Sequence, residues 1–338
     1  MVEVPPFEMP FAARLSPHAD RVRLHTRTWA RDMGMFDGMP WTEARYDAAD
    51  YGGFGPLTHP TLPLADLKHV NDWHTWGFHV SDVFRDRFLR PRDVAGGKAF
   101  VAELRSVLAG TAAPVGPAGR GLADLLSRST VDDEDRHHLG EHLDALLWEL
   151  HNTAQGRVPD PVDLVEMRRR SIGAELSAKL LRGSVGAELP PELLRNSTMR
   201  ALVDSFGDVA ALRQEIVGFD HVHATGASTT SAVLAVRQFF DCGLEQAVSI
   251  VADLISARLR QIVSIIGELP AVAAEHDLDA EARAGLHRYA EALKSWLAGE
   301  LLWTRRSGRF SSSPTPVRRP FHRPAGLGTA AVLVSSPR

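Results

Sequence analysis

The 338-residue sequence has little of several features that mark particular classes of protein. A single cysteine, Cys242, excludes an internal disulfide and a thiolate metal cage, so we expect it to be a small buried hydrophobic residue. Basic charge is not in excess, because 38 Lys and Arg residues against 42 Asp and Glu give a formal net charge of −4. Proteins that bind phosphate backbones need such an excess, so nucleic acid is not the expected partner.

Long apolar runs are also missing. The sequence has no 18 consecutive apolar residues, and its N-terminus has neither a basic flank nor an apolar run. We therefore expect a cytoplasmic protein with no membrane span and no export signal. Alternation of apolar and polar residues, which is typical of strands, is absent as well.

The sequence does have helical periodicity. Residues 244–267 carry apolar residues at steps of three or four, and Pro270 is expected to end this helix: Val248, Val251, Ile255, Leu259, Ile262 and Ile266. A second helix is predicted over 133–151; the acidic run 132–135 fits the positive end of a helix dipole better than a metal site. Further helices are predicted over 18–33, 64–89, 99–108, 161–182, 198–217, 230–240 and 280–303.

The breaks between these segments are short, so none of them indicates an interdomain linker. One shift of composition occurs where the run Ser311-Ser-Ser-Pro-Thr-Pro begins. We predict a single all-α domain over residues 1–310 and a Ser- and Pro-rich tail over 311–338, either mobile or draped over the domain.

The first candidate for chemistry is the segment 73–86. Asp82 and Asp86 are four residues apart, so both carboxylates face one side of a helix. Aromatic residues precede them: Trp73, Trp76 and Phe78. One interpretation is an aromatic wall with acids at its rim. The other is a solvated face on which the acids pair with nearby arginines: Arg85, Arg87 and Arg90.

The whole chain resembles the bacterial class I terpene synthases, in particular a domain of the germacradienol/geosmin synthases. The resemblance is carried by these segments: Pro10-Phe-Ala-Ala-Arg-Leu-Ser-Pro-His, Trp29-Ala-Arg-Asp-Met-Gly-Met, Leu57-Thr-His-Pro, Asn71-Asp-Trp, Arg120-Gly-Leu-Ala-Asp-Leu, Leu147-Trp-Glu-Leu, Gly156-Arg-Val-Pro-Asp-Pro-Val-Asp, Glu166-Met-Arg-Arg and Gly326-Leu-Gly-Thr-Ala-Ala. It implies a single helical bundle that encloses an apolar cavity, a small terpenoid substrate and, in many members, a homodimer. It also implies that three Mg²⁺ ions and cationic side chains draw a diphosphate off the substrate.

The resemblance places the magnesium ligands on two motifs, and this sequence departs from both. In the acidic motif, Ser81 stands at the first position, ahead of Asp82 and Asp86. The second motif has its ligand positions at Gln214, Gly218 and Val222, with Glu215 beside the first. The chain has only three asparagines, and none of them supplies a shifted copy of this motif. We therefore predict no bound metal, or Mg²⁺ only under the second hypothesis below.

The groups that handle the diphosphate are better kept. The resemblance assigns the diphosphate sensor to Arg168 and a late Arg-Tyr pair to Arg309-Phe310. Arg168 could instead belong to a solvated basic face, and Arg309 could simply pair with Asp82. Phe78 and Trp303 are predicted to line the cavity wall, although both fit an ordinary core equally well.

The nearby histidines are not favoured as metal ligands. His221 and His223 are two residues apart on a predicted helix, so their side chains point in different directions. A transition-metal site made of His79, His221 and Asp82 remains a less favoured alternative.

Three hypotheses follow from the altered motifs. The leading one is a cyclase or lyase that protonates a neutral terpenoid without Mg²⁺, using Asp82, Asp86 or Glu215 as the acid. The second is an Mg²⁺-dependent synthase with a degraded site, acting on farnesyl or geranyl diphosphate. The third is an inactive homologue that binds a hydrophobic ligand.

Product analysis with and without chelator separates the first two hypotheses. The leading one predicts product from a neutral terpene alcohol in EDTA, because no metal is needed to start the reaction. The second predicts that EDTA or the Asp82→Asn substitution abolishes product. Magnesium-dependent cyclisation of a diphosphate at ordinary rates would contradict the leading hypothesis.

Overall fold

In a computed structural model of the chain, the structure describes residues 8–225 and 229–310, without the side chains of 220–225 and Phe310. Within these ranges the regular structure is helical, apart from an isolated bridge between Gly38 and Trp41. The helices are α1 Ala19–Asp32, α2 Glu43–Ala49, α3 Phe54–Thr58, α4 Leu64–Phe84, α5 Val94–Leu108, α6 Gly116–Ser127, α7 Asp133–Gln155, α8 Pro161–Ser171, α9 Ala174–Ser184, α10 Pro191–Leu194, α11 Ser197–Thr225, α12 Ala232–Phe239, α13 Leu244–Glu275 and α14 Ala280–Arg306. Short turns of other helix types lie at Tyr51–Gly53, Arg85–Leu89 and Gly308–Phe310. The all-α prediction is confirmed.

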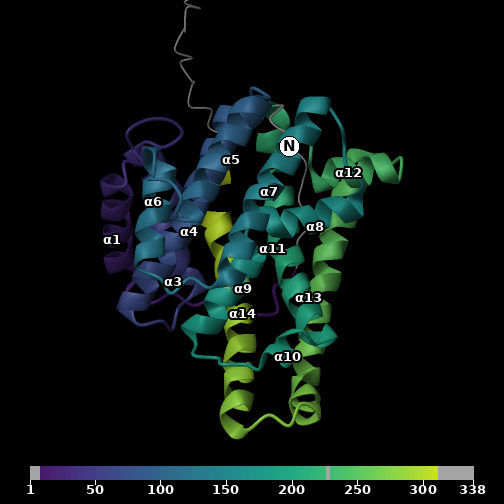
Figure 1. The fold of residues 1–338 in the computed structure, drawn as a ribbon. Helices are drawn as coiled ribbons and strands as arrows, with labels where there is room; N and C mark the ends of the chain where they lie inside the picture. Colours follow the sequence, from purple (N-terminus) through teal and green to yellow (C-terminus); the bar gives the residue numbers. More distant parts are fainter. Residues whose placement is uncertain (1–7, 226–228, 311–338) are drawn as a thin grey trace, which may run out of the picture.

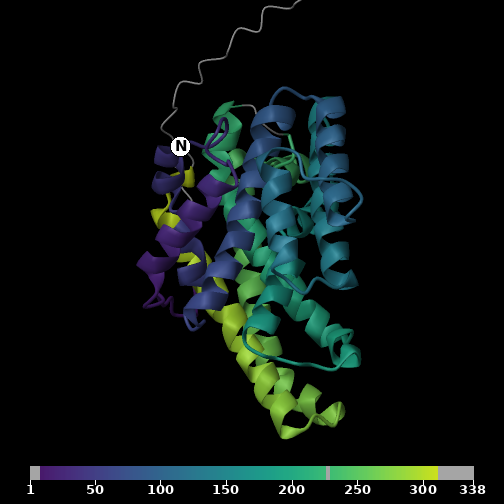
Figure 2. The same cartoon turned by 60° about the vertical axis from the view of Figure 1, so that its left-hand side comes forward.

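The helices form a bundle with a central group and two flanks (Figure 1). Helices α1 and α6 pack on one side of α4, while α12 and α13 lie on the other side, next to α11. The far ends of α13 and α14 extend beyond the bundle as a helical hairpin (Figure 2). In the described part of the chain, no helix is long and apolar enough to cross a membrane.

Most predicted helices occur close to their predicted bounds, and the largest apolar stripe is core as expected. Val251, Ile255 and Ile262 of α13 are fully buried. The acidic run 132–135 begins α7 through a capping box, in which Asp132 accepts from the Asp135 N–H and Asp135 accepts from the Asp132 N–H.

The predictions of helix ends were wrong in two places, both at residues that usually break helices. Pro270 does not end α13, which continues to Glu275 although a proline removes one backbone hydrogen bond. The helix predicted over 161–182 is divided into α8 and α9 at Gly173, whose φ of 65° is left-handed.

Shorter elements were missed. Helices α2, α3, α6 and α10 were not predicted. Cys242 is only partly buried, which corrects the expectation of a buried residue. The predicted tail lies outside the described residues, so the division of the chain at residue 310 stays a prediction.

Helices α14 and α3 pack closely against each other at Gly299 of α14, which has no side chain. A Cβ atom added to Gly299 would overlap the carbonyl group of Leu57. Because that obstacle is backbone, neither helix can yield without moving as a whole. Gly299 thus fixes how closely α14 approaches α3, and α3 carries part of the wall described below.

We expect Gly299→Ala to lower the free energy of unfolding by about 1–3 kcal/mol or more, as overpacking does elsewhere. The matched control is Gly267→Ala in α13, where an added Cβ meets nothing within 4 Å. That substitution should raise stability by up to about 1 kcal/mol through helix propensity. Urea denaturation of both variants tests the pair, and equal effects would contradict the assignment.

Candidate active site

A cavity of about 250 Å³ lies between α4, α7, α8, α9, α11 and α14. It brings together ten residues that the sequence analysis had singled out from distant segments: Trp73, Trp76, Phe78, Ser81, Arg85, Arg168, Gln214, Glu215, Gly218 and Arg309. On α4, His74, Phe78 and Ser81 follow one another at steps of four and three, so they occupy one helix face. This face of α4 forms one wall of the cavity.

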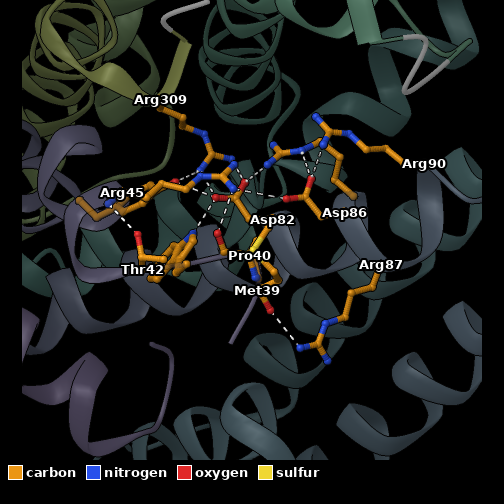
Figure 3. A network of polar contacts seen from close by, with 12 residues as sticks. Met39, Pro40, Thr42, Arg45, Asp82, Asp86, Arg87, Arg90 and Arg309 are labelled. Carbon is orange, nitrogen blue, oxygen red and sulfur yellow. Dashed lines mark hydrogen bonds and ion pairs between the residues drawn. The ribbon is translucent and has the colours of Figure 1, made fainter. Parts of the chain in front are cut away.

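Asp82 stands beside the cavity in a dense set of polar contacts (Figure 3). Its Oδ2 accepts hydrogen bonds from Trp41 Nε1 at 2.8 Å, Tyr51 Oη at 2.7 Å and Arg309 Nη1 at 3.0 Å. Its Oδ1 lies 2.8 Å from Arg309 Nη2 and 2.9 Å from Arg85 Nη2. The pairing of Arg309 with Asp82 is therefore confirmed.

These contacts hold Asp82 in its ionised form. Burial by itself would raise the pKa of the Asp82 carboxyl, but Arg309, Arg85 and the two neutral donors hold it well below its usual range. A carboxylate held in this way has no proton to give. The geometry therefore does not support the proton-donor role predicted for Asp82.

Asp86 follows in the turn after α4, and it too is surrounded by arginines. Its Oδ1 lies 3.2 Å from Arg85 Nε and 3.3 Å from Arg90 Nη1, and its Oδ2 lies 3.5 Å from Arg45 Nη1. Arg87 points elsewhere and donates to the carbonyl of Met39 (Figure 3). The expected pairing with Arg85 and Arg90 is present, but Asp82 is only 1% exposed, so a solvated face is the wrong description.

A second ion-pair network lines the cavity on α7, α8 and α11. Arg168 Nη1 lies 2.9 Å from Glu149 Oε2, and Arg168 Nε lies 2.7 Å from Glu215 Oε1. Glu149 also accepts from Thr230 Oγ1 at 3.0 Å, and Glu215 Oε2 accepts from the Ala232 N–H at 3.0 Å. Arg168 thus faces the cavity between two carboxylates, not a solvated basic surface.

Glu215 is part of the same network. Burial raises the pKa of its carboxyl above the usual value, although Arg168 acts in the opposite direction. One of its oxygens pairs with the Arg168 guanidinium, and the other accepts from a backbone N–H. The proton-donor role predicted for Glu215 therefore stays a prediction. Glu149 had no predicted role, although it stands in the quoted segment Leu147-Trp-Glu-Leu.

The aromatic wall has two layers. Phe78 lines the cavity, and Trp303 stacks behind it with ring centroids 5.1 Å apart. Phe54 meets both rings edge to face. The Arg309 guanidinium carbon lies 4.9 Å from the centroid of Phe78, so the charged rim and the aromatic wall are in direct contact.

The predicted metal positions contain few suitable oxygens. Ser81 Oγ donates to the carbonyl of Gly77 at 2.9 Å, Gln214 offers an amide, and Gly218 has no side chain. The side chain of Val222 lies outside the described residues, as does that of His221. Mg²⁺ prefers carboxylate oxygens, and the carboxylates that line the cavity, Glu149 and Glu215, both bind Arg168.

His79 does not line the cavity. Its ring lies 5.0 Å from that of Trp41, and burial lowers the pKa of His79 to about 4. The alternative site made of His79, Asp82 and His221 cannot be assembled from the described side chains, and it stays untested.

Comparison with known proteins agrees with this geometry. The model of "Terpene synthase family 2, C-terminal metal binding" matches residues 72–261. This chain belongs to the terpene synthase family. The matched range begins on α4 and ends on α13, so it contains both of the predicted motifs.

Named relatives extend over the whole fold. Pristinol synthase from Streptomyces pristinaespiralis is 29% identical, with 98% of this chain and 91% of the relative covered. Isoafricanol synthase from Streptomyces violaceusniger is 30% identical, over 91% and 84% of the two chains. The crystal structure of linalool/nerolidol synthase from Streptomyces clavuligerus has a TM-score of 0.76 at 25% identity, covering 89% of this chain and 100% of that one. The chain is thus an enzyme of the bacterial class I terpene synthase type.

The network around Asp82 predicts a pH-dependent loss in Asp82→Asn. Because the folded pKa of Asp82 lies below its unfolded value, its stabilisation is complete above about pH 4 and is lost as the pH falls toward the folded pKa. We expect Asp82→Asn to cost about 3–5 kcal/mol of unfolding free energy at pH 7, and less below about pH 4.

Denaturation curves from pH 3 to pH 8 measure this loss. Asp20→Asn is the control, because Asp20 pairs with Arg23 at an almost fully exposed position. Its effect should stay small at every pH, since exposed ion pairs contribute little. A loss in Asp82→Asn that does not change with pH would contradict the assignment.

Proposed function

We propose that this terpene synthase ionises a prenyl diphosphate and cyclises the resulting cation, with farnesyl diphosphate as its substrate. The observation that carries the proposal is the placement of Arg168 and Arg309 on the lining of one aromatic cavity. Relatives support the substrate: 4-epi-cubebol synthase from Streptosporangium roseum, 24% identical over 94% of this chain, is named as farnesyl diphosphate cyclizing. The cavity is near the small end of ligand pockets, which suits one short apolar chain.

The two guanidinium groups are suited to receive the diphosphate. Guanidinium presents a planar set of N–H donors that binds phosphate oxygens in pairs. Here those donors are engaged by Glu149, Glu215 and Asp82. A diphosphate entering the cavity would compete with these carboxylates for the same donors, and its developing negative charge on departure would strengthen the new contacts.

The aromatic layer would then protect the cation that remains. Phe78 presents its ring to the cavity with Trp303 behind it, and ring faces attract positive charge. The neighbouring aliphatic side chains keep water away: Leu139, Leu146, Leu176 and Leu180. Exclusion of water is needed because a cation in contact with water would be captured before it cyclised.

Magnesium, when bound by a class I synthase, neutralises diphosphate charge. The described side chains at its expected positions do not fit that ion. Ser81 and Gln214 provide a hydroxyl and an amide, and the carboxylates of the acidic motif, Asp82 and Asp86, are paired with arginines. The charge stabilisation that this chain itself supplies comes from Arg168 and Arg309.

The neutral-substrate hypothesis needs an acid, and the structure provides carboxylates that are already paired. Both oxygens of Asp82 and of Glu215 have a polar partner, and Asp86 lies among three arginines. The pKa of Asp82 lies well below its usual range because its arginines outweigh burial, whereas burial raises the pKa of Glu215. Protonation by these residues stays a prediction, and ionisation of a diphosphate agrees better with the contacts.

The purified protein should release diphosphate from farnesyl diphosphate and form cyclic products in a mass-spectrometric assay. Geranyl and geranylgeranyl diphosphates and the free alcohols farnesol and nerolidol serve as competing substrates, each with Mg²⁺ and with EDTA. Turnover confined to the free alcohols would overturn the proposal. The reactions with EDTA measure how much diphosphate is released when the arginines are the only cationic groups.

Replacing one cavity arginine by lysine tests whether the planar set of donors is needed in addition to the positive charge. We expect Arg168→Lys to lower kcat/KM for farnesyl diphosphate by about 10²-fold, because the planar donor pair is lost. Arg170→Lys is the matched control two residues later; Arg170 pairs with Glu166 and Glu141 outside the cavity lining. Equal losses in the two variants would contradict a specific role for Arg168.

A further inference from the structure

Two histidines, the buried His59 and the half-buried His74, connect the cavity with a second pocket. His74 lines the cavity on the same face of α4 as Phe78 and Ser81, and His59 lines a separate pocket of about 560 Å³. Their ring centroids are 5.5 Å apart. One bridging water molecule or a small ring rotation spans that separation. The two rings thus form a polar link between the cavity and the second pocket.

The hydrogen bonds of Thr58 set the tautomer of His59. The Thr58 hydroxyl donates its one hydrogen to the carbonyl of Phe54 at 2.9 Å. Its oxygen therefore accepts from His59 Nδ1, which is also 2.9 Å away. His59 Nδ1 therefore carries the hydrogen, and Nε2 carries a lone pair. Within the described ranges, Nε2 of His59 and Nε2 of His74 are both buried without a hydrogen-bond partner.

Both rings are neutral and poorly able to keep a proton. Burial lowers the pKa of His74 to about 3, and burial together with His74 holds the pKa of His59 well below its usual value. A carbocation is so strong an acid that a neutral imidazole still accepts its proton. An imidazolium in these surroundings would pass the proton on.

The second pocket provides the way out. Its lining includes the exposed side chains of His287 and Glu291 on α14, which are in contact with water and can accept protons. Pro10 and Phe11 of the N-terminal segment lie on its lining as well. His74 stands seven residues before Ser81, about 10 Å along α4 from the charged rim. The proton would therefore leave at a distance from the diphosphate.

We propose that His74 accepts the proton that ends the cyclisation and that His59 relays it to water in the second pocket. The proposal rests on the proposed function. A C–H bond beside the cationic carbon breaks, its electron pair becomes the new C=C bond, and the proton binds the free nitrogen lone pair of His74. When water captures the cation instead, the proton comes from the bound water. The other ring proton of His74 then passes to His59 Nε2, and His59 releases its Nδ1 proton to water.

A second cavity histidine has a different arrangement. His142 Nδ1 lies 3.3 Å from the carbonyl of Arg170, and it can only donate to that oxygen. In the described chain, no ring contact joins His142 to another histidine. His142 is therefore a matched comparison: a buried imidazole on the same cavity without a relay.

Product ratios, normalised to the diphosphate released, test the relay. We expect His59→Ala to lower the share of the dominant product by roughly tenfold or more, as loss of a proton acceptor does. Imidazole added to the buffer should restore that share in His59→Ala, because the space opened faces the second pocket. His74→Phe should show the same loss without rescue. In His142→Phe, imidazole should leave the product ratio of that variant unchanged, because no relay passes through His142.

Several outcomes would overturn the relay. They are unchanged product ratios in both His59→Ala and His74→Phe, a loss in His59→Ala that imidazole does not reverse, or an equal effect of imidazole on His142→Phe. If His59→Ala fails to fold, which melting curves reveal, His74→Phe decides, because phenylalanine can keep the edge-to-face contact that His74 makes with Phe54. Conversion of neutral alcohols alone by the wild-type protein would overturn the proposed function. The relay would then be tested with the product ratios from the alcohol, because the cation formed from it also loses a final proton.

Discussion

The contact between Asp82 and Arg309 is the interaction on which the charged end of the cavity depends. It joins the end of α4 to the turn after α14, residues that are 227 positions apart in the sequence. Trp41, in the loop after α1, and Tyr51, in the turn after α2, donate to the same carboxylate. One ionised group thereby joins four segments, and the Arg309 guanidinium that it holds reaches the face of Phe78. Loss of Asp82 would remove the buried carboxylate that faces two guanidinium groups, those of Arg309 and Arg85.

The fold could be read from the sequence because its signals are local and repeated. The stripe on α13 and the acidic start of α7 each depend on residues within a few turns. The errors fall where one residue was given too much weight: Pro270 was read as an end, and Gly173 was not read as a break. At Pro270 the long packed helix outweighed one lost hydrogen bond, whereas at Gly173 a left-handed backbone was decisive.

The site could be predicted only in part. The family resemblance located Ser81, Arg168, Gln214 and Arg309, and the fold brings them to one cavity. The pair of Arg309 and Asp82 was anticipated, but the pair of Arg168 and Glu149 was not, because no spacing rule encodes that contact. The hydrogen bond between Thr58 and His59 was also missed, although the two residues are adjacent in the sequence. Its possible role depends on the second pocket, which only the folded chain reveals.

The single face of α4 that carries His74, Phe78 and Ser81 has a consequence for how such an enzyme can diversify. In the proposed reaction, these positions would face the leaving group, the cation and the proton that ends the reaction. Since they are about one turn apart, a change of one side chain need not disturb the backbone that holds the others. Substrate choice and product outcome could then vary separately in a lineage, and directed mutagenesis could address each step through a different position of the same helix.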